Sequence, residues 1–284
     1  MRAGSIAEAC EWLLKDGSDA KLIAGGQSLV PMMAMRLTRP RRLVDINEIA
    51  ALKLVKVESG VARTGACARQ CVVECDDALA ARVPLLRQAL AWVGHAQTRN
   101  RGTVGGSLAH ADPAAELPLA AQVLGAEMVL RSAAGVRTVG AAAFFTGPLM
   151  TAAEPHECLE EIRWPVWAGP GAGSAFLEVS RRHGDFAIVA AAAQLALDGD
   201  GRCTRVSFGI GGGGSTPRAF PELAAHLVGT RLEAAAVTGA ARDAAAGVDF
   251  SSDLHAGADY RRHLAAVLAA RALRAAQERA RSAR

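Results

Sequence analysis

The chain has 284 residues, 51% of them hydrophobic and 21% charged, so it can form two packed cores and does not have the composition of a disordered segment. A net charge of only +4 and 4% aromatic residues argue against a nucleic-acid partner. The sequence has no apolar run of the roughly 20 residues that a membrane span needs, no signal-peptide pattern, and too few cysteines for a disulfide scaffold, so we expect a cytoplasmic protein with reduced thiols.

The N-terminal stretch predicts a helix, a short strand and a glycine-rich loop. Ser5-Ile6-Ala7-Glu8 has the capping-box pattern, and apolar periodicity continues to about Lys15. The apolar run 21–23 predicts a strand that opens into the loop 24–29. Glycines in such a turn can aim consecutive N–H groups at one point, which suits an anion.

The middle of the chain predicts mixed helices and strands. Alternating residues predict a hairpin of 52–57 and 61–64, a second of 127–130 and 136–139, and a strand over 159–164. Periodicity predicts helices over 68–80 and 84–97. The second helix leads into another glycine-rich loop, 101–107, in which we expect Gly105 and Gly106 to form a second nest beside the Thr103 and Ser107 hydroxyls. Two facing nests could hold a pyrophosphate.

The stretch 165–173 is rich in proline and glycine and is the best candidate domain boundary. Beyond it, 175–180, 188–197 and 205–210 predict three antiparallel strands. Helices are expected over 218–227, 232–245 and 259–279.

Five stretches, 24–37, 98–118, 181–187, 215–229 and 253–273, resemble in this order the FAD-binding medium subunit of molybdenum hydroxylases, the family of carbon monoxide dehydrogenase, xanthine dehydrogenase and bacterial N-heterocycle dehydrogenases. The resemblance implies an α+β fold. Residues 1–168 are expected to form a two-part FAD-binding fold like that of vanillyl-alcohol oxidase, with small α/β subdomains at about 1–42 and 43–168. Residues 174–284 are expected to form a C-terminal domain with a three-stranded antiparallel sheet and helices.

The same resemblance implies an electron-transfer subunit that binds FAD non-covalently. Its expected partners are a small subunit with iron-sulfur clusters and a large molybdopterin subunit, together forming a dimer of heterotrimers. Electrons would reach FAD from the clusters and leave to an external acceptor. The substrate would bind the large subunit, and a small heterocycle or an aldehyde is favoured.

The expected FAD site draws on both glycine-rich loops and on later residues. The pyrophosphate is expected between the two loops, with Glu116 facing the cofactor and Asp112 either behind it or capping the turn before Pro113. Phe186, often Tyr in related chains, either lies against the isoalloxazine ring or is a plain core aromatic. The expected cofactor-binding residues are Ala24, Gly25, Gly26, Gln27, Ser28, Leu29, Thr103, Val104, Gly105, Gly106, Ser107, His110, Glu116, Asp185 and Phe186.

Other interpretations remain open at this stage. The glycines of 209–214 match G-x-G-x-x-G, but the required parallel strand and acidic residue do not follow. Cys67, Cys71 and Cys75 would share one helix face, either as ligands of a metal or cluster, as small packing residues, or as an exposed face that is sensitive to oxidation. A stand-alone flavin oxidoreductase and a flavin-free assembly subunit are the alternative functions. Family members carry an extended segment before the first helix, so either the start codon lies upstream or an edge strand is absent.

Overall fold

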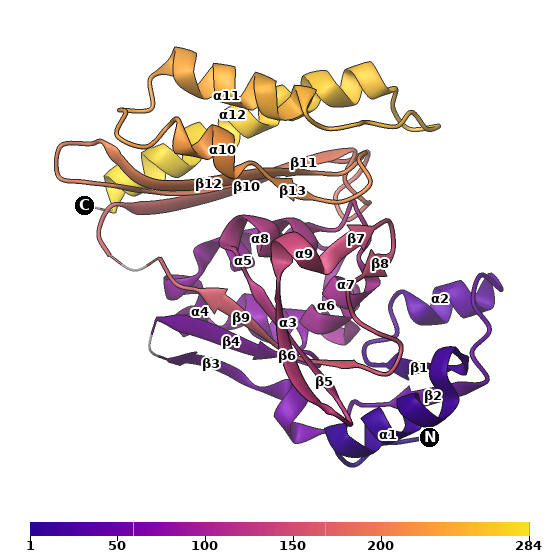
Figure 1. The fold of residues 1–284 in the computed structure, drawn as a ribbon. Helices are drawn as coiled ribbons and strands as arrows, with labels where there is room; N and C mark the ends of the chain where they lie inside the picture. Colours follow the sequence, from indigo (N-terminus) through magenta and orange to yellow (C-terminus); the bar gives the residue numbers. More distant parts are fainter. Residues whose placement is uncertain (59, 168, 284) are drawn as a thin grey trace.

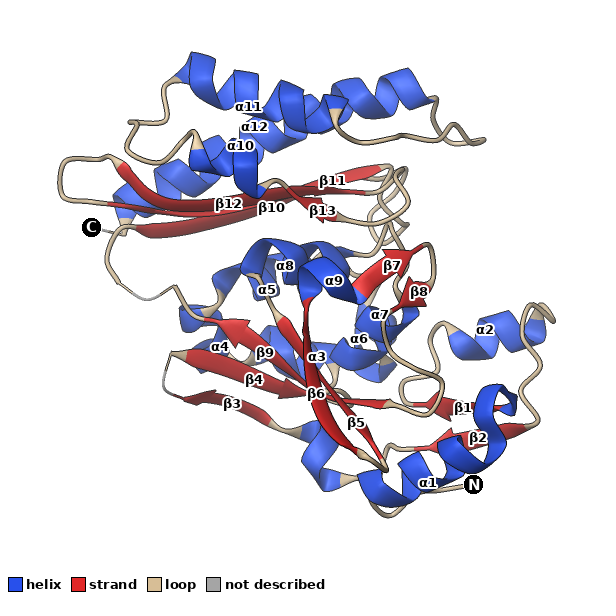
Figure 2. Ribbon diagram, in the orientation of Figure 1, coloured by secondary structure: helices blue, strands red, loops and turns tan. Residues whose placement is uncertain are grey.

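The computed structural model describes residues 1–58, 60–167 and 169–283. Ser59 in the expected first hairpin turn, Ala168 at the expected end of the first domain, and Arg284 lie outside this range. Helices α11 (Ala234–Ala246) and α12 (Ala258–Ser282) cover one face of a sheet, and helices α5 (Pro84–Leu90) and α8 (Glu116–Leu124) cover its other face (Figure 1). A second sheet lies beyond α5 and α8, so the layers alternate between helices and strands (Figure 2).

The N-terminal unit contains α1 (Ile6–Asp16), the 3-10 turn η1 (Gly17–Asp19), β1 (Ala20–Ile23), α2 (Leu29–Ala34) and β2 (Arg42–Asp45). The Ser5 hydroxyl accepts a hydrogen bond from the Glu8 N–H at 3.1 Å, which confirms the predicted N-cap. Strands β1 and β2 are parallel. Arg2 forms a parallel bridge with Asp45, so the stretch before α1 does pair with the sheet edge, through one bridge.

The central sheet is antiparallel, in the order β3-β4-β9-β5-β6. Its strands are β3 (Val55–Glu58), β4 (Val61–Gly65), β5 (Glu127–Ser132), β6 (Gly135–Gly140) and β9 (Cys158–Pro165). Both predicted hairpins are confirmed, but the predicted strand start at Leu52 is wrong. Leu52 lies in the 3-10 turn η2 (Ala50–Lys53), where its carbonyl accepts from the Cys67 N–H at 2.7 Å instead of from a strand.

Each of the two long helices predicted before the second loop is broken in two. The first becomes α3 (Gln70–Cys75) and α4 (Asp77–Arg82), because the Asp76 side chain caps a new helix by accepting from the Leu79 N–H at 2.8 Å. The second becomes α5 and α6 (Ala96–Arg101), separated by a turn in which Gly94 has φ +47°. After these come α7 (Val104–His110), α8, α9 (Ala141–Phe144) and the small hairpin β7 (Phe145–Gly147) with β8 (Met150–Thr151).

The C-terminal sheet confirms the three predicted antiparallel strands as β10 (Ala172–Val179), β11 (Val189–Leu197) and β12 (Cys203–Gly211). A fourth strand, β13 (Arg218–Ala219), replaces the expected start of a helix, because its two residues pair with Ile210 and Gly209. The helix α10 therefore begins only at Pro221 and ends at Ala225. The helices predicted over 232–245 and 259–279 are α11 and α12.

Two hydrophobic cores follow from this layering. The inner face of the C-terminal sheet, with Phe176, Ala190 and Ala192, belongs to the core of the N-terminal half. The outer face packs on α11 and α12 and forms the second core. Small residues allow this close packing: a Cβ on Gly173 would overlap the backbone of α12.

The glycine run 209–214 contributes to packing between the two halves. A Cβ on Gly209 would lie 3.0 Å from Val123, and one on Gly211 would lie 3.3 Å from Leu119, so both glycines let α8 lie close to β12. Strand β12 is antiparallel to both of its neighbours, so the run does not belong to a dinucleotide-binding βαβ unit. Within the described part of the chain, we find no helix with the length and apolarity to cross a membrane.

Candidate functional site

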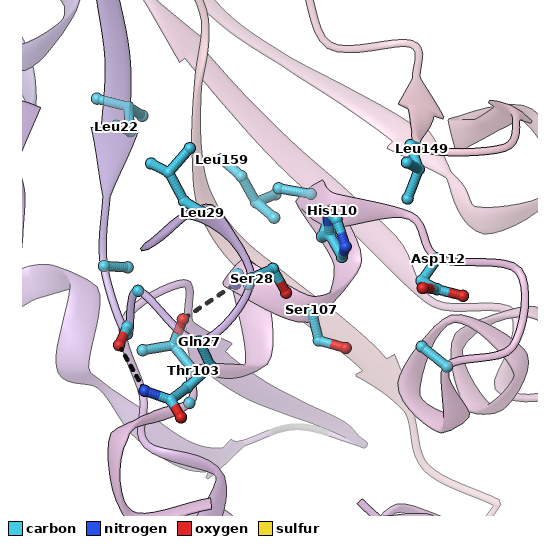
Figure 3. A pocket seen from close by; sticks show the side chains of 18 of the residues that line it. Leu22, Gln27, Ser28, Leu29, Thr103, Ser107, His110, Asp112, Leu149 and Leu159 are labelled. Atoms are coloured by element: carbon cyan, nitrogen blue, oxygen red, sulfur yellow. Dashed lines mark hydrogen bonds between the residues drawn. The ribbon is translucent and has the colours of Figure 1, made fainter. Parts of the chain in front are cut away.

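A cavity of about 900 Å³ lies between the first glycine loop, α7, the β7–β8 hairpin and the loop that follows β10. This volume falls within the range of roughly 300–1,000 Å³ that is usual for cofactor and small-molecule sites. Figure 3 shows Ser28 and Leu29 of the first loop opposite Ser107 and His110 of α7. Every residue of the predicted site lines this cavity except Val104, which is buried in the core.

The first loop presents a row of unpaired backbone donors. Gly26 has φ +72°, a conformation that favours glycine, and turns the chain from β1 toward α2. The backbone N–H groups of Gly25 through Leu29 have no hydrogen-bond partner among the described residues. Asn47 supports the loop from behind by donating to the Ala24 carbonyl at 2.8 Å. The loop therefore has the donor arrangement of an anion-binding nest.

The second loop is not a nest, and this part of the prediction is wrong. It is the start of helix α7, with Thr103 as its N-cap. The N–H groups of Val104 and Gly105 donate to Ala68 and Ala66, and that of Gly106 donates to the Thr103 hydroxyl oxygen at 3.0 Å (Figure 3). The hydroxyl groups of Thr103 and Ser107 are the donors that this segment can offer to a bound group.

The glycines of the second segment are required by protein packing. A Cβ on Gly105 would overlap Ala66, and one on Gly106 would lie 2.6 Å from the Thr103 hydroxyl oxygen. Gly102 has a similar restriction, because its Cβ would overlap the side chain of the buried Gln70. These glycines therefore place α7 against the central sheet and position the two hydroxyl groups.

The two glycine-rich segments meet backbone to backbone. A Cβ on Gly25 would overlap the Arg101 carbonyl oxygen and lie 2.9 Å from the Gly102 Cα. Arg69 fixes the same junction, since its guanidinium donates to the Arg101 carbonyl and, at 2.8 Å, to the Asn47 side chain. Residues far apart in the sequence thus form one continuous wall of the cavity.

A buried carboxyl group is among the residues that line the cavity. Glu116 is the first residue of α8 and is 5% exposed. Burial raises its pKa to about 7, and the nearby Asp112 carboxylate adds to this shift. Asp112 itself accepts from the Ala114 N–H at 2.9 Å, which confirms its expected role in capping the turn before Pro113.

The loop after β10 closes one side of the cavity. Phe186 lines the cavity and is 64% exposed, so the alternative of a plain core aromatic is wrong. Gly184, with φ +89°, lies directly against the ring of His95, and His183 stacks on Trp92 with ring centroids 5.7 Å apart. The C-terminal half therefore contributes Asp185 and Phe186 to a cavity built mainly by the N-terminal half.

Several lining residues were missed from the sequence. Leu149 and Met150 come from the small β7–β8 hairpin, which has no recognisable motif. The Leu149 N–H donates to the Ala111 carbonyl at 3.1 Å, so the hairpin is held at the end of α7. Lys21 on β1 also lines the cavity and supplies a cation, whereas Arg101 of the second loop is not among the residues that line it. In the sequence, Lys21 belongs to a short apolar run, and nothing in that run predicts that its side chain lines a cavity.

The expected cysteine arrangement is wrong in its geometry. Cys67 precedes α3, is buried, and donates to the Ile46 carbonyl at 3.7 Å, whereas Cys75 at the end of α3 is exposed. The three cysteines therefore do not share a helix face. In the described ranges, no three His, Cys, Asp or Glu residues are grouped so that they could hold a metal ion.

Comparisons with known proteins match both halves of the chain. Residues 1–167 match the family model described as the FAD binding domain in molybdopterin dehydrogenase. Residues 174–276 match the model of the CO dehydrogenase flavoprotein C-terminal domain.

Individual relatives share much of the sequence and nearly all of the fold. The chain is 41% identical to the 6-hydroxypseudooxynicotine dehydrogenase complex subunit alpha of Paenarthrobacter nicotinovorans, over 75% of this chain and 72% of the relative. It is 38% identical to the carbon monoxide dehydrogenase medium chain of Afipia carboxidovorans, over 83% and 81%. The crystal structure of the Cu,Mo-CO dehydrogenase contains a chain that matches with a TM-score of 0.95 and 37% identity, over 98% of this chain and 96% of that one.

Proposed function

This chain belongs to the family of FAD-binding medium subunits of molybdenum hydroxylases, and from this premise we propose that the cavity between its two glycine-rich segments holds FAD non-covalently. Its function is that of an FAD-binding electron-transfer subunit of a multi-subunit oxidoreductase. Bound FAD supplies the chemistry of accepting electrons and passing them to an acceptor. The contribution of this chain is to bind, orient and shield that cofactor.

The observation that carries the proposal is the row of unpaired N–H groups from Gly25 to Leu29. A diphosphate is a strong hydrogen-bond acceptor, and consecutive backbone donors with positive local dipoles suit it. The hydroxyl groups of Thr103 and Ser107 lie across the cavity, and Lys21 adds positive charge. The donor set therefore fits the anionic part of FAD.

The remaining lining residues would hold the rest of the cofactor. Phe186 offers an exposed aromatic face, Asp185 and His110 offer polar groups, and Glu116 offers a carboxyl whose pKa of about 7 leaves it partly neutral near neutral pH. Leu149 and Met150 form an apolar edge that would limit access of water. We assign the cofactor site to the predicted residues other than Val104.

We propose that the chain assembles with a small iron-sulfur subunit and a large molybdopterin subunit as a dimer of heterotrimers in the cytoplasm. The names of its relatives support this, since they include a medium chain, a medium subunit and a subunit of a dehydrogenase complex. Those relatives are named for different substrates, carbon monoxide and 6-hydroxypseudooxynicotine among them, although their sequences are similar. Substrate choice therefore lies with the large subunit.

The visible absorption spectrum of the chain, purified alone and in complex with co-expressed partner subunits, tests this proposal. We expect the absorption bands of bound flavin and the release of one FAD per chain on denaturation. A stable complex with the partner subunits that releases no FAD on denaturation, and that gains no flavin when FAD is added, would contradict the proposal and favour a flavin-free assembly subunit.

A further inference from the structure

Few bonds attach the loop that carries Phe186 to the rest of the chain. This loop, residues 181–187, lies between β10 and β11. The Asp185 N–H donates to a carbonyl of the loop itself, at 3.0 Å. Among the described residues, one hydrogen bond joins the 181–187 loop to a distant segment, at 3.4 Å between Arg181 and His255. Other contacts must therefore determine where the Phe186 side chain lies.

Two ring contacts attach the 181–187 loop to the turn between α5 and α6. His183 stacks on Trp92, with ring centroids 5.7 Å apart and ring planes 27° apart. Gly184 lies so close to the His95 ring that a Cβ on it would be 2.6 Å from the ring carbon Cε1. Both contacts lie directly before Asp185 in the sequence, so they fix the backbone from which the cavity-lining side chains of the loop extend.

The turn that receives these contacts is itself fixed to the N-terminal half. Arg99 donates to the Val93 carbonyl at 3.0 Å and to the Gly94 carbonyl at 3.4 Å. Its guanidinium also pairs with Glu74 of α3 at 2.7 Å, and both of these side chains are largely buried. Val93 and Gly94 line the cavity. The turn therefore forms part of the cavity wall and also supports a loop of the C-terminal half.

We propose that Trp92 and His95 are positioning residues, which hold the 181–187 loop so that Phe186 faces the cavity. Neither of them is among the residues that line the cavity, so both act through the loop. A loop that is held in place before the cofactor binds avoids the entropy cost of ordering it during binding. The effect on the cofactor rests on the proposed function, whereas the attachment of the loop does not.

Limited trypsin digestion of the cofactor-free chain tests the attachment, because Arg181 is an exposed cleavage site within the loop. Cleavage needs local opening, so its rate follows the population of detached loop. Loss of one aromatic contact in His183→Ala should raise the rate of cleavage after Arg181 roughly 2–10-fold, and His95→Ala should also be cut faster than wild type. Both variants change exposed side chains, so we expect them to fold. Cleavage at the wild-type rate in both would overturn the attachment.

A double-mutant cycle on FAD affinity tests the positioning. His183→Ala should weaken FAD binding roughly 2–10-fold in wild type and have little effect in a chain that already carries Phe186→Ala, because the side chain to be positioned is then absent. His226→Ala, a matched change at an exposed position after α10, should bind FAD as wild type does. Equal losses from His183→Ala in both backgrounds would overturn the positioning of Phe186. If wild type does not bind FAD, the proposed function fails, and trypsin digestion still decides whether the ring contacts hold the loop.

Discussion

Gly25 and Gly102 lie in direct backbone contact, so that even a Cβ on Gly25 would be only 2.9 Å from the Gly102 Cα. This contact joins the loop with the unpaired N–H groups to the segment that starts α7. Glycine at position 25 is therefore needed for the fit between two protein segments, in addition to any approach of a cofactor. The position of the anion-binding donors depends on this junction.

Phe186→Ala should separate cofactor binding from folding. Because Phe186 is 64% exposed, we expect the free energy of unfolding to change by less than about 0.5 kcal/mol. Loss of an aromatic contact worth about 0.5–1.5 kcal/mol should weaken FAD binding by roughly 2–10-fold. Titration of FAD followed by flavin fluorescence, together with urea unfolding, measures both quantities.

Phe208→Ala is the matched control for that variant. Phe208 is 1% exposed in the core between the C-terminal sheet and α11 and α12, so its truncation should cost about 3–5 kcal/mol of unfolding free energy. A loss of similar size in Phe186→Ala would show that Phe186 supports the fold and would contradict its assignment to the cavity.

Glu178 predicts a pH dependence of stability. Its pKa is raised by burial in the folded state, so the folded chain holds the proton more tightly than the unfolded chain does. The contribution of Glu178 to stability is then fully present below the ordinary carboxyl pKa, and this contribution is lost as the pH rises toward about 8. In Glu178→Gln this loss should be smaller by about 2–4 kcal/mol between pH 5 and 9. Urea unfolding at both pH values measures it, and parallel wild-type and variant curves would show that Glu178 ionises normally.

The cysteines predict an ordered reactivity toward a thiol reagent. Cys75 is exposed and should react first, whereas Cys67 and Cys203 are buried and burial raises the pKa of each to about 11. In native chain we expect Cys75→Ser to abolish the fast phase of labelling. Denaturant should expose all six thiols. Rapid labelling of Cys67 in the folded chain would contradict its burial next to the Ile46 carbonyl.

Most of the fold could be predicted from local patterns. The Ser5 cap and the three long C-terminal strands have strong local signals and are confirmed. The break at Asp76 was missed because apolar periodicity continues across it and outweighed the capping signal. Thr103 was interpreted as part of a loop although it caps a helix, because two glycines follow it and glycine is unusual in a first helical turn.

The sequence predicted the two glycine-rich segments of the candidate site, but it did not predict how these segments contact each other. The sequence contains no local sign that Gly25 contacts Gly102, since that contact depends on how β1 packs against the rest of the chain. Glu178 was missed for the same reason: its burial results from α5 and α8 covering the inner face of the C-terminal sheet. Lys21 and Leu149 also reach the cavity only through tertiary packing.

The FAD affinity of Gly25→Ala tests the central claim most directly. Gly239→Ala is the matched control, because Gly239 lies in α11 and a Cβ there would meet no atom within 4 Å. Added FAD should bind wild type and Gly239→Ala equally, and Gly25→Ala at least about tenfold more weakly, a loss of about 1.4 kcal/mol, because its methyl group forces the two segments apart. A folded Gly25→Ala chain that binds FAD as tightly as wild type would place the cofactor elsewhere.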